Sequence, residues 1–292
     1  MEFYLNKNFV LDTRAKKPKI SLIGVPFDCT QIEFPGSRFG PNKIRETLLH
    51  LYTIDTEKDI AIFDYLEDLG NINIVYGDTE KTMKTIVKFI DKFNDQRSSC
   101  PIFLGGEHSI TYGILKGLQK KYKKIDLIVF DAHLDCTESF SGEKLGHITY
   151  LYNLIKEKIV KNVTVIGARQ YSKEELEFAK KNKIKILKEK DINSKTLKTK
   201  NPTYVSVDLD VLDFNFAIGT GTPELDGPDI YLVIEMLEEI IANNEIIGLD
   251  IVELNPMLQE SRTTEYCASY ILRQIMFGLI EKNLNQKKIK KS

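Results

Sequence analysis

Short apolar runs of strand length recur along the chain, and longer amphipathic segments lie between them. The longer segments repeat their apolar residues every three or four positions, as in residues 81–97 (KTMKTIVKFIDKFNDQR) and 229–244 (DIYLVIEMLEEIIANN). Buried parallel strands have nearly continuous apolar sequences. The alternation therefore predicts a three-layer α/β/α fold with a central, mostly parallel sheet. The apolar runs are residues 19–25, 100–106, 125–130, 163–169, 203–212 and 245–254.

The pattern continues without a break that would divide the chain, so a single domain over residues 1–292 is expected. We find no internal repeat, no low-complexity tract and no long linker rich in Pro, Gly or Ser. Residues 1–18 are predicted to be an N-terminal extension and residues 284–292 a basic tail, both peripheral to that domain. The lysines of the tail are typical of a solvated helix end, with a basic targeting signal as the alternative.

Charge and composition exclude several classes of partner. Lys plus Arg number 41 and Asp plus Glu number 42, so no overall field draws the protein to nucleic acid or to an anionic membrane. No run reaches the roughly 18 apolar residues of a membrane span, and the first residues lack a signal-peptide core. A cytoplasmic protein is expected. The four cysteines show no CxxC spacing, which argues against a disulfide framework and a zinc knuckle.

Acidic residues and histidines gather where the apolar runs end. Residues 125–130 lead directly into DAHLD, whose polar residues alternate and share one side if the extended conformation continues. Sites in parallel sheets form at the carboxyl ends of the strands, so these side chains are expected to converge. The residues expected to meet at this edge, which are candidate metal ligands, are His108, Asp131, His133, Asp135, Asp208 and Asp210.

Four carboxylates this close together would raise one another's pKa and destabilise the fold unless cations compensate them. Two divalent ions neutralise four aspartates formally. Taken singly, each aspartate has an alternative interpretation as a helix cap and each histidine as a core residue. The set argues otherwise, because three of only four histidines (His108, His133 and His147) fall at or just after these strand ends. Oxygen and imidazole ligands without thiolate favour two Mn²⁺ per chain, with iron, cobalt or nickel as alternatives.

A two-metal centre is hydrolytic by default, because it lowers the pKa of a shared water molecule. Its charge balance favours a cationic or neutral substrate. A phosphate ester, the minor alternative, would need Arg or Lys in these motifs, and none is present. Glu253 follows another apolar run and is expected to bind a planar guanidinium through two hydrogen bonds. We assign catalysis to His147 and Asp135, with His147 also contacting substrate and passing a proton to the leaving amine.

These residues lie in motifs that resemble the ureohydrolase family, which includes arginases, agmatinases and guanidinobutyrases. The resemblance runs from Gly24 to Pro256 and rests on GGEHSI, DAHLD, SVDLDVLD, GTGTPE and GLDIVELNP, in that order. It implies that the six candidate ligands hold two manganese ions, that Glu253 binds guanidinium and that His147 shuttles protons. It also implies a central parallel sheet of about eight strands and assembly as homo-oligomers, usually trimers or hexamers.

Among the members of that family, the segment GVPFDCTQIEFPGSRFGPNKIRE is most similar to agmatinases, which convert agmatine to putrescine and urea. Arginases carry an asparagine and an acidic residue for the amino-acid head group, and this chain has Thr137 and Gln170 in those places. Agmatine is therefore the expected substrate. The alternatives are guanidinobutyrase, guanidinopropionase, arginase or formiminoglutamase activity, or a metal-binding protein without turnover.

Overall fold

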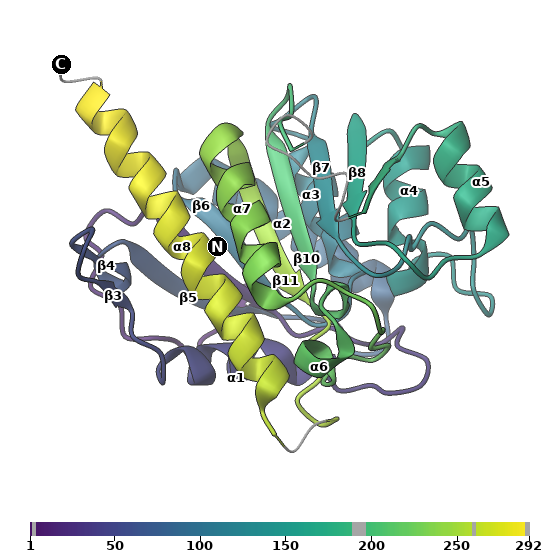
Figure 1. Ribbon diagram of the computed structural model, residues 1–292, viewed down its shortest axis with the longest axis horizontal. Coiled ribbons are helices and arrows are strands. Elements are labelled where there is room, and N and C mark those ends of the chain that lie inside the picture. Colours follow the sequence, from purple (N-terminus) through teal and green to yellow (C-terminus); the bar gives the residue numbers. More distant parts are fainter. Residues whose placement is uncertain (2–3, 189–196, 259–260, 290–292) are drawn as a thin grey trace.

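Among the residues that the computed structural model describes, nine strands form the central sheet, in the spatial order β1-β5-β2-β6-β11-β10-β7-β8-β9 (Figure 1). Of these nine strands, β1 pairs antiparallel with β5, and the other eight run parallel. In chain order the strands are β1 (Leu5–Asn6), β2 (Ile20–Val25), β5 (Leu66–Ile72), β6 (Cys100–Gly105), β7 (Asp126–Phe130), β8 (Asn162–Ile166), β9 (Lys185–Leu187), β10 (Thr203–Asp208) and β11 (Ile246–Val252).

Helices cover both faces of this sheet (Figure 1). One face packs against α1, α7 and α8, and the other against α2, α3, α4 and α5, so two apolar cores lie on either side of the strands. The helices are α1 (Gly40–Leu48), α2 (Thr79–Gln96), α3 (Ile110–Leu118), α4 (Tyr150–Lys156), α5 (Lys173–Lys181), α6 (Phe214–Ala217), α7 (Ile230–Asn243) and α8 (Thr263–Ile289). A separate two-stranded sheet is formed by β3 (Ile54–Asp55) and β4 (Ile60–Ala61).

The middle strands have the sequence expected of strands that are covered on both faces. Every residue of β2, β7 and β10 is buried, and so are all but the first residues of β6 and β11. Alternate side chains point to opposite cores, and both cores are apolar, which explains why these runs show no polar alternation. The three-layer α/β/α prediction is confirmed.

The order of the strands brings distant parts of the sequence to one edge. β6 and β7 follow each other in the chain, yet β11 and β10 lie between them in the sheet. The four strands are parallel, so the residues that follow them meet at one carboxyl edge. Such a change in strand order opens a crevice beyond the strand ends, which is where ligands bind in α/β sheets.

The expected eight parallel strands are present, and β1 adds a ninth at the edge of the sheet. This short strand comes from residues 1–18, and Leu11 of the same segment is buried. The structure describes residues 1, 4–188, 197–258 and 261–289, so the end of the predicted tail at 284–292 lies outside them. Within the described residues, no helix is both long enough and apolar enough to cross a bilayer.

Candidate metal centre and active site

Each of the four middle strands delivers a polar residue to the same edge of the sheet. His108 follows β6, Asp131 directly follows β7, Asp208 is the last residue of β10, and Glu253 directly follows β11. The remaining candidates come from the loops that continue β7 and β10 and are His133, Asp135 and Asp210. The structure therefore brings all six predicted metal ligands to the carboxyl edge of the sheet.

Gly106 allows the chain to reach this edge after β6. A Cβ atom at this position would lie 2.0 Å from the carbonyl oxygen of Phe27, so no other residue fits without moving the backbone. The close approach lets the N–H of Glu107 donate to the Phe27 carbonyl at 2.7 Å. This contact holds the loop that carries His108 against the end of β2.

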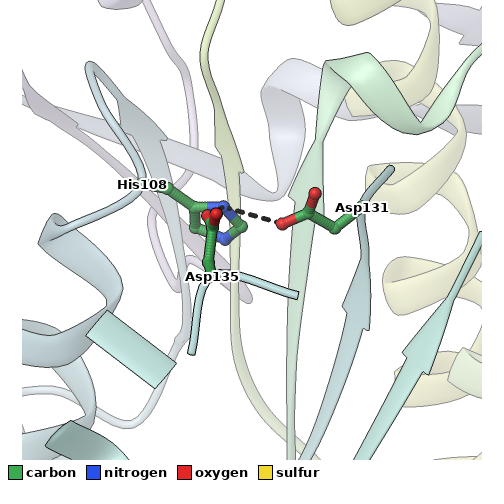
Figure 2. Close-up of side chains that lie close together, drawn as sticks. All are labelled: His108, Asp131 and Asp135. Carbon is green, nitrogen blue, oxygen red and sulfur yellow. Dashed lines mark ion pairs between the residues drawn. The ribbon is translucent and has the colours of Figure 1, made fainter. Parts of the chain in front are cut away.

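Three carboxylates surround the imidazole of His108. Its Nδ1 atom lies 3.0 Å from Oδ2 of Asp208, 3.2 Å from Oδ2 of Asp131 and 3.6 Å from Oδ2 of Asp135. Figure 2 shows His108 facing Asp131 and Asp135, which come from the two ends of the DAHLD loop. All four side chains are buried. This is the first half of the candidate centre.

His133 forms the second half. Its Nδ1 atom lies 2.9 Å from Oδ2 of Asp210 and 3.5 Å from Oδ1 of Asp131. Two groups therefore have ligand atoms close enough to hold a metal ion: His108 with Asp131 and Asp135, and His133 with Asp131 and Asp210. Asp131 belongs to both groups, with one oxygen toward each histidine. A shared carboxylate of this kind suits two neighbouring ions.

A hydrogen-bond chain behind His108 determines which nitrogen carries its proton. Ser206 donates its only hydroxyl proton to Oδ1 of Asp250 at 2.5 Å. The Ser206 oxygen must then accept from Nε2 of His108, which lies 2.9 Å away. Asp250 is held in turn by Thr111 and Tyr204, which both donate to its Oδ2 atom at 2.8 Å. When the imidazole is neutral, it therefore presents the lone pair of Nδ1 to the three aspartates.

That lone pair and the carboxylates around it fit a bound cation. Nδ1 of His108 and Oδ2 of Asp131 are both buried without a hydrogen-bond partner. A lone pair directed at three carboxylates is repulsive unless a positive ion lies between them. Buried polar atoms without a partner are rare and need an explanation. The donor set, two imidazoles and four carboxylates, fits a pair of divalent cations in charge and in chemistry.

The electrostatics of the metal-free site agree with this fit. Burial, together with the charges of Asp210 and Asp131, raises the pKa of Asp208 well above its usual value. Burial lowers the pKa of His133, but the charge of Asp210 and the hydrogen bonds to its carboxylate neighbours outweigh it and raise that pKa far above normal. Both shifts favour a bound proton in the cluster, and a metal ion bound there would displace it.

Glu253 stands beside this cluster with its backbone in the left-handed region, at a φ of 67°. Its Oε1 atom accepts the backbone N–H of His108 at 2.7 Å, and its Oε2 atom accepts Nε2 of Gln31 at 2.6 Å. Burial and the nearby Asp208 and Glu107 raise its pKa well above the usual value. A strained backbone residue at a cluster of charges is typical of functional sites.

His147 lines the same cavity as Glu253 and lies at the start of the short 3-10 helix η4 (His147–Thr149). Thr30 donates its hydroxyl proton to Glu107 at 2.5 Å, so its oxygen accepts Nδ1–H of His147 at 3.1 Å. The Nε2 atom is then the unprotonated nitrogen of the neutral ring. Burial lowers the pKa of His147 to about 4, so the free ring is neutral at pH 7. It can accept a proton and pass it on.

A cavity of about 400 Å³ opens over these residues. Its floor carries the polar side chains of the candidate centre, and its mouth is lined by exposed or half-buried apolar and aromatic side chains. The residues of the floor are His133, Asp135, His147, Asp208, Asp210 and Glu253. Those of the mouth are Ile32, Phe34, Phe140, Ile148 and Tyr171. A polar floor below an apolar mouth is a common form of small-molecule site.

Several residues of the site were missed in the sequence. Ser206 and Asp250 form the chain behind His108, and Thr30 and Gln31 hold His147 and Glu253. A signal was present for the first two, since Ser206 lies two residues before Asp208 in one strand and pairs with Asp250 in the next. Thr30 and Gln31 come from a loop, where no periodicity marks a side chain.

Asp250→Asn is expected to lower metal affinity about 10- to 100-fold, as is typical when the partner of a ligating histidine is changed. The two carboxylate oxygens of Asp250 accept three hydroxyl protons, from Thr111, Tyr204 and Ser206. Asparagine replaces one of these oxygens with an NH₂ group, so Ser206 no longer reliably accepts Nε2–H of His108. Competition with a chromophoric chelator measures the affinity. Asp126→Asn is the matched control, because Asp126 is also buried and hydrogen-bonded but lies at the opposite end of β7. Equal affinities in the two variants would contradict the role of Asp250.

Known proteins resemble this chain over nearly its whole length. A family model described as the arginase family matches residues 18–278. The chain is 33% identical to the agmatinase of Bacillus cereus, over 96% of this chain and 99% of that protein. It is 35% identical to the N(1)-aminopropylagmatine ureohydrolase of Thermococcus kodakarensis, over 82% of this chain and 83% of that protein. The agmatine ureohydrolase structure of Thermoplasma volcanium has a TM-score of 0.81 and 28% identity, covering 96% of this chain and 98% of that one.

Proposed function

Because the chain belongs to the arginase family, we propose that it hydrolyses agmatine to putrescine and urea. The observation that carries the choice of substrate is the charge of the cavity. None of the residues that line it, all of which lie in the described part of the chain, is lysine or arginine, whereas three glutamates, Glu33, Glu175 and Glu253, line it besides the candidate metal ligands. Such a cavity suits a substrate with two cationic ends and no carboxylate. Agmatine has this character.

The arginine that follows β8 does not supply the missing positive charge. Arg169 donates to backbone carbonyls of residues 167, 210, 211, 212, 224 and 225, at 2.7 to 3.3 Å. Its guanidinium therefore holds the loops after β8 and β10 together. The neighbouring Gln170 lines the cavity, but it carries no charge for an α-amino group. This supports the expectation that arginine is a poor substrate.

We propose Mn²⁺ as the metal, held by the six candidate ligands as two ions per chain. Oxygen and imidazole donors without thiolate favour it over structural zinc. When bound, such a pair supplies Lewis acidity and lowers the pKa of a water molecule so that it becomes a nucleophile near neutral pH. The metal-free protein should therefore release no urea until divalent ions are restored.

The chain's own residues would orient the substrate and move protons. Glu253 would fix the plane of the guanidinium by two parallel hydrogen bonds, with its carbon facing the ligand cluster. Asp135 borders both the cluster and the cavity, so its carboxylate can take the proton that water releases on attacking this carbon. The unprotonated Nε2 of His147 would receive this proton from Asp135 and, as the bond from carbon to the chain nitrogen breaks, deliver it to the leaving amine. The products are urea and protonated putrescine.

A panel of guanidino compounds tests the proposed substrate. We expect kcat/KM to be highest for agmatine and at least about 100-fold lower for arginine and 4-guanidinobutyrate, because a buried carboxylate without a partner costs several kcal/mol. Urea release is measured at one manganese concentration for all three compounds. A preference for either carboxylate-bearing compound would overturn the assignment to agmatine. Absence of urea from every compound would favour a metal-binding protein without turnover.

The family resemblance supports two further proposals about the protein in the cell. We propose that it contributes to polyamine biosynthesis in the cytoplasm, since putrescine is a polyamine precursor. We also propose that it assembles as a homotrimer or homohexamer and that its substrate is a small molecule. Light scattering coupled to gel filtration gives the mass of the assembly.

A further inference from the structure

Gln31 lies between β2 and the 3-10 helix η2 (Ser37–Phe39) and lines the cavity beside Glu253. Its amide nitrogen donates to Oε2 of Glu253 at 2.6 Å. Its amide oxygen is buried and has no hydrogen-bond partner. A buried acceptor without a donor is unfavourable, and the imbalance is removed if a ligand supplies one.

The orientation of this amide follows from its neighbour. The NH₂ group of Gln31 faces Glu253 and donates to its carboxylate, so the carbonyl oxygen of the same amide points elsewhere. Glu253 is held from its other side by the backbone N–H of His108. Each carboxylate oxygen thus has one protein partner and keeps a lone pair for a further donor. The two side chains therefore present their free acceptor positions on one wall of the cavity.

We propose that Gln31 is a second guanidinium-binding residue, which accepts an N–H of the substrate through Oε1 next to the carboxylate of Glu253. This inference rests on the proposed function of the site. A guanidinium has only donors, arranged in one plane around its carbon. Glu253 satisfies two of them, and the free oxygen of Gln31 satisfies a third that the carboxylate cannot reach. A neutral acceptor here adds specificity without adding a further charge to an already anionic site.

Gln31 would contribute to binding more than to the chemical step. Its contact with the guanidinium is present both before the reaction and in the transition state, so its loss should raise KM with little change in kcat. Gln31→Met keeps the length of the side chain and removes both polar ends. We expect this variant to lower kcat/KM for agmatine about 10- to 100-fold, the loss typical of a hydrogen bond to a charged group. Gln96→Met, at the exposed end of α2, is the matched control.

The variant must be separated from an indirect effect on Glu253, since Gln31 also donates to that carboxylate. Gln31→Met is therefore repeated in the Glu253→Gln background. If Gln31 contacts the substrate itself, the double variant loses a further 5-fold or more relative to Glu253→Gln alone. A loss that appears only with native Glu253 would show that Gln31 merely positions the carboxylate, and would overturn the proposal.

Calorimetric titration with guanidinium chloride makes the result independent of turnover. The metal-loaded native protein should bind the guanidinium ion, and Gln31→Met should weaken that binding at least about 5-fold. Unchanged binding in the variant would overturn the role of Gln31, even if agmatine proved to be the substrate. If the native protein released no urea from agmatine but Gln31→Met still weakened guanidinium binding, the proposed function would fail while the role of Gln31 in guanidinium binding would stand.

Discussion

His133→Ala and Asp208→Ala are each expected to leave fewer than two metal ions per chain and to lower kcat/KM by roughly 1000-fold or more. The reason is that each side chain lies at the centre of the cluster. His133 lies near Asp131 and Asp210. Asp208 lies near His108. Loss of one ion removes several kcal/mol of transition-state stabilisation. Elemental analysis of the dialysed protein gives the stoichiometry, and urea release gives the activity.

The matched control is His50→Ala, because His50 is the one histidine outside the site and is exposed after α1. It should retain full metal content. The metal-free forms distinguish loss of a ligand from loss of the fold. Burial and neighbouring carboxylates raise the pKa of Asp208, so its ionisation near neutral pH costs stability. Metal-free Asp208→Ala should therefore unfold no earlier than the metal-free native protein. Full metal content in both ligand variants would contradict the centre.

Glu253→Gln is expected to lower kcat/KM about 30- to 1000-fold, or about 2 to 4 kcal/mol, while leaving metal content unchanged. The amide keeps the shape of the side chain and can still accept the N–H of His108. It no longer carries the negative charge that attracts the guanidinium. Burial raises the pKa of Glu253 well above normal, so the free protein tolerates a neutral group at this position. The melting temperature should therefore stay close to that of the native protein.

Glu245→Gln is the matched control, because Glu245 is exposed and directly precedes the same strand, β11. It should change neither activity nor metal content. A fall in metal stoichiometry in Glu253→Gln would place Glu253 among the metal ligands instead of the substrate contacts. Unchanged activity in that variant would mean that the guanidinium is anchored by other residues.

The fold and the convergence of the candidate ligands were predictable from the sequence for the same physical reason. Buried parallel strands are apolar throughout, so a run such as residues 125–130 is conspicuous, and the polar residues Asp131 and His133 that follow it stand out as exceptions. Parallel strands must end at one edge, which makes the convergence of such residues predictable. The spatial order of the strands was not needed for this step, although β11 and β10 lie between β6 and β7 in the sheet.

The supporting residues were less accessible because their partners are distant in the sequence. Asp250 looks like one more polar position in an apolar strand until the register places it opposite Ser206. Gln31 and Thr30 lie in a loop, and their contacts to Glu253 and His147 span 222 and 117 positions. No local pattern encodes such contacts. The amino-terminal β1 was also unforeseen, since two residues are too few for a periodic signal.

Titration of the metal-free protein with Mn²⁺, with urea release from agmatine followed at each addition, tests the central claim most directly. The claim is that two ions, held by His108 and His133 with a shared Asp131, make the protein a ureohydrolase acting on agmatine. We expect activity to rise until two equivalents per chain are bound and then to stay constant. Full activity at one equivalent, or no urea with both ions bound, would contradict the account.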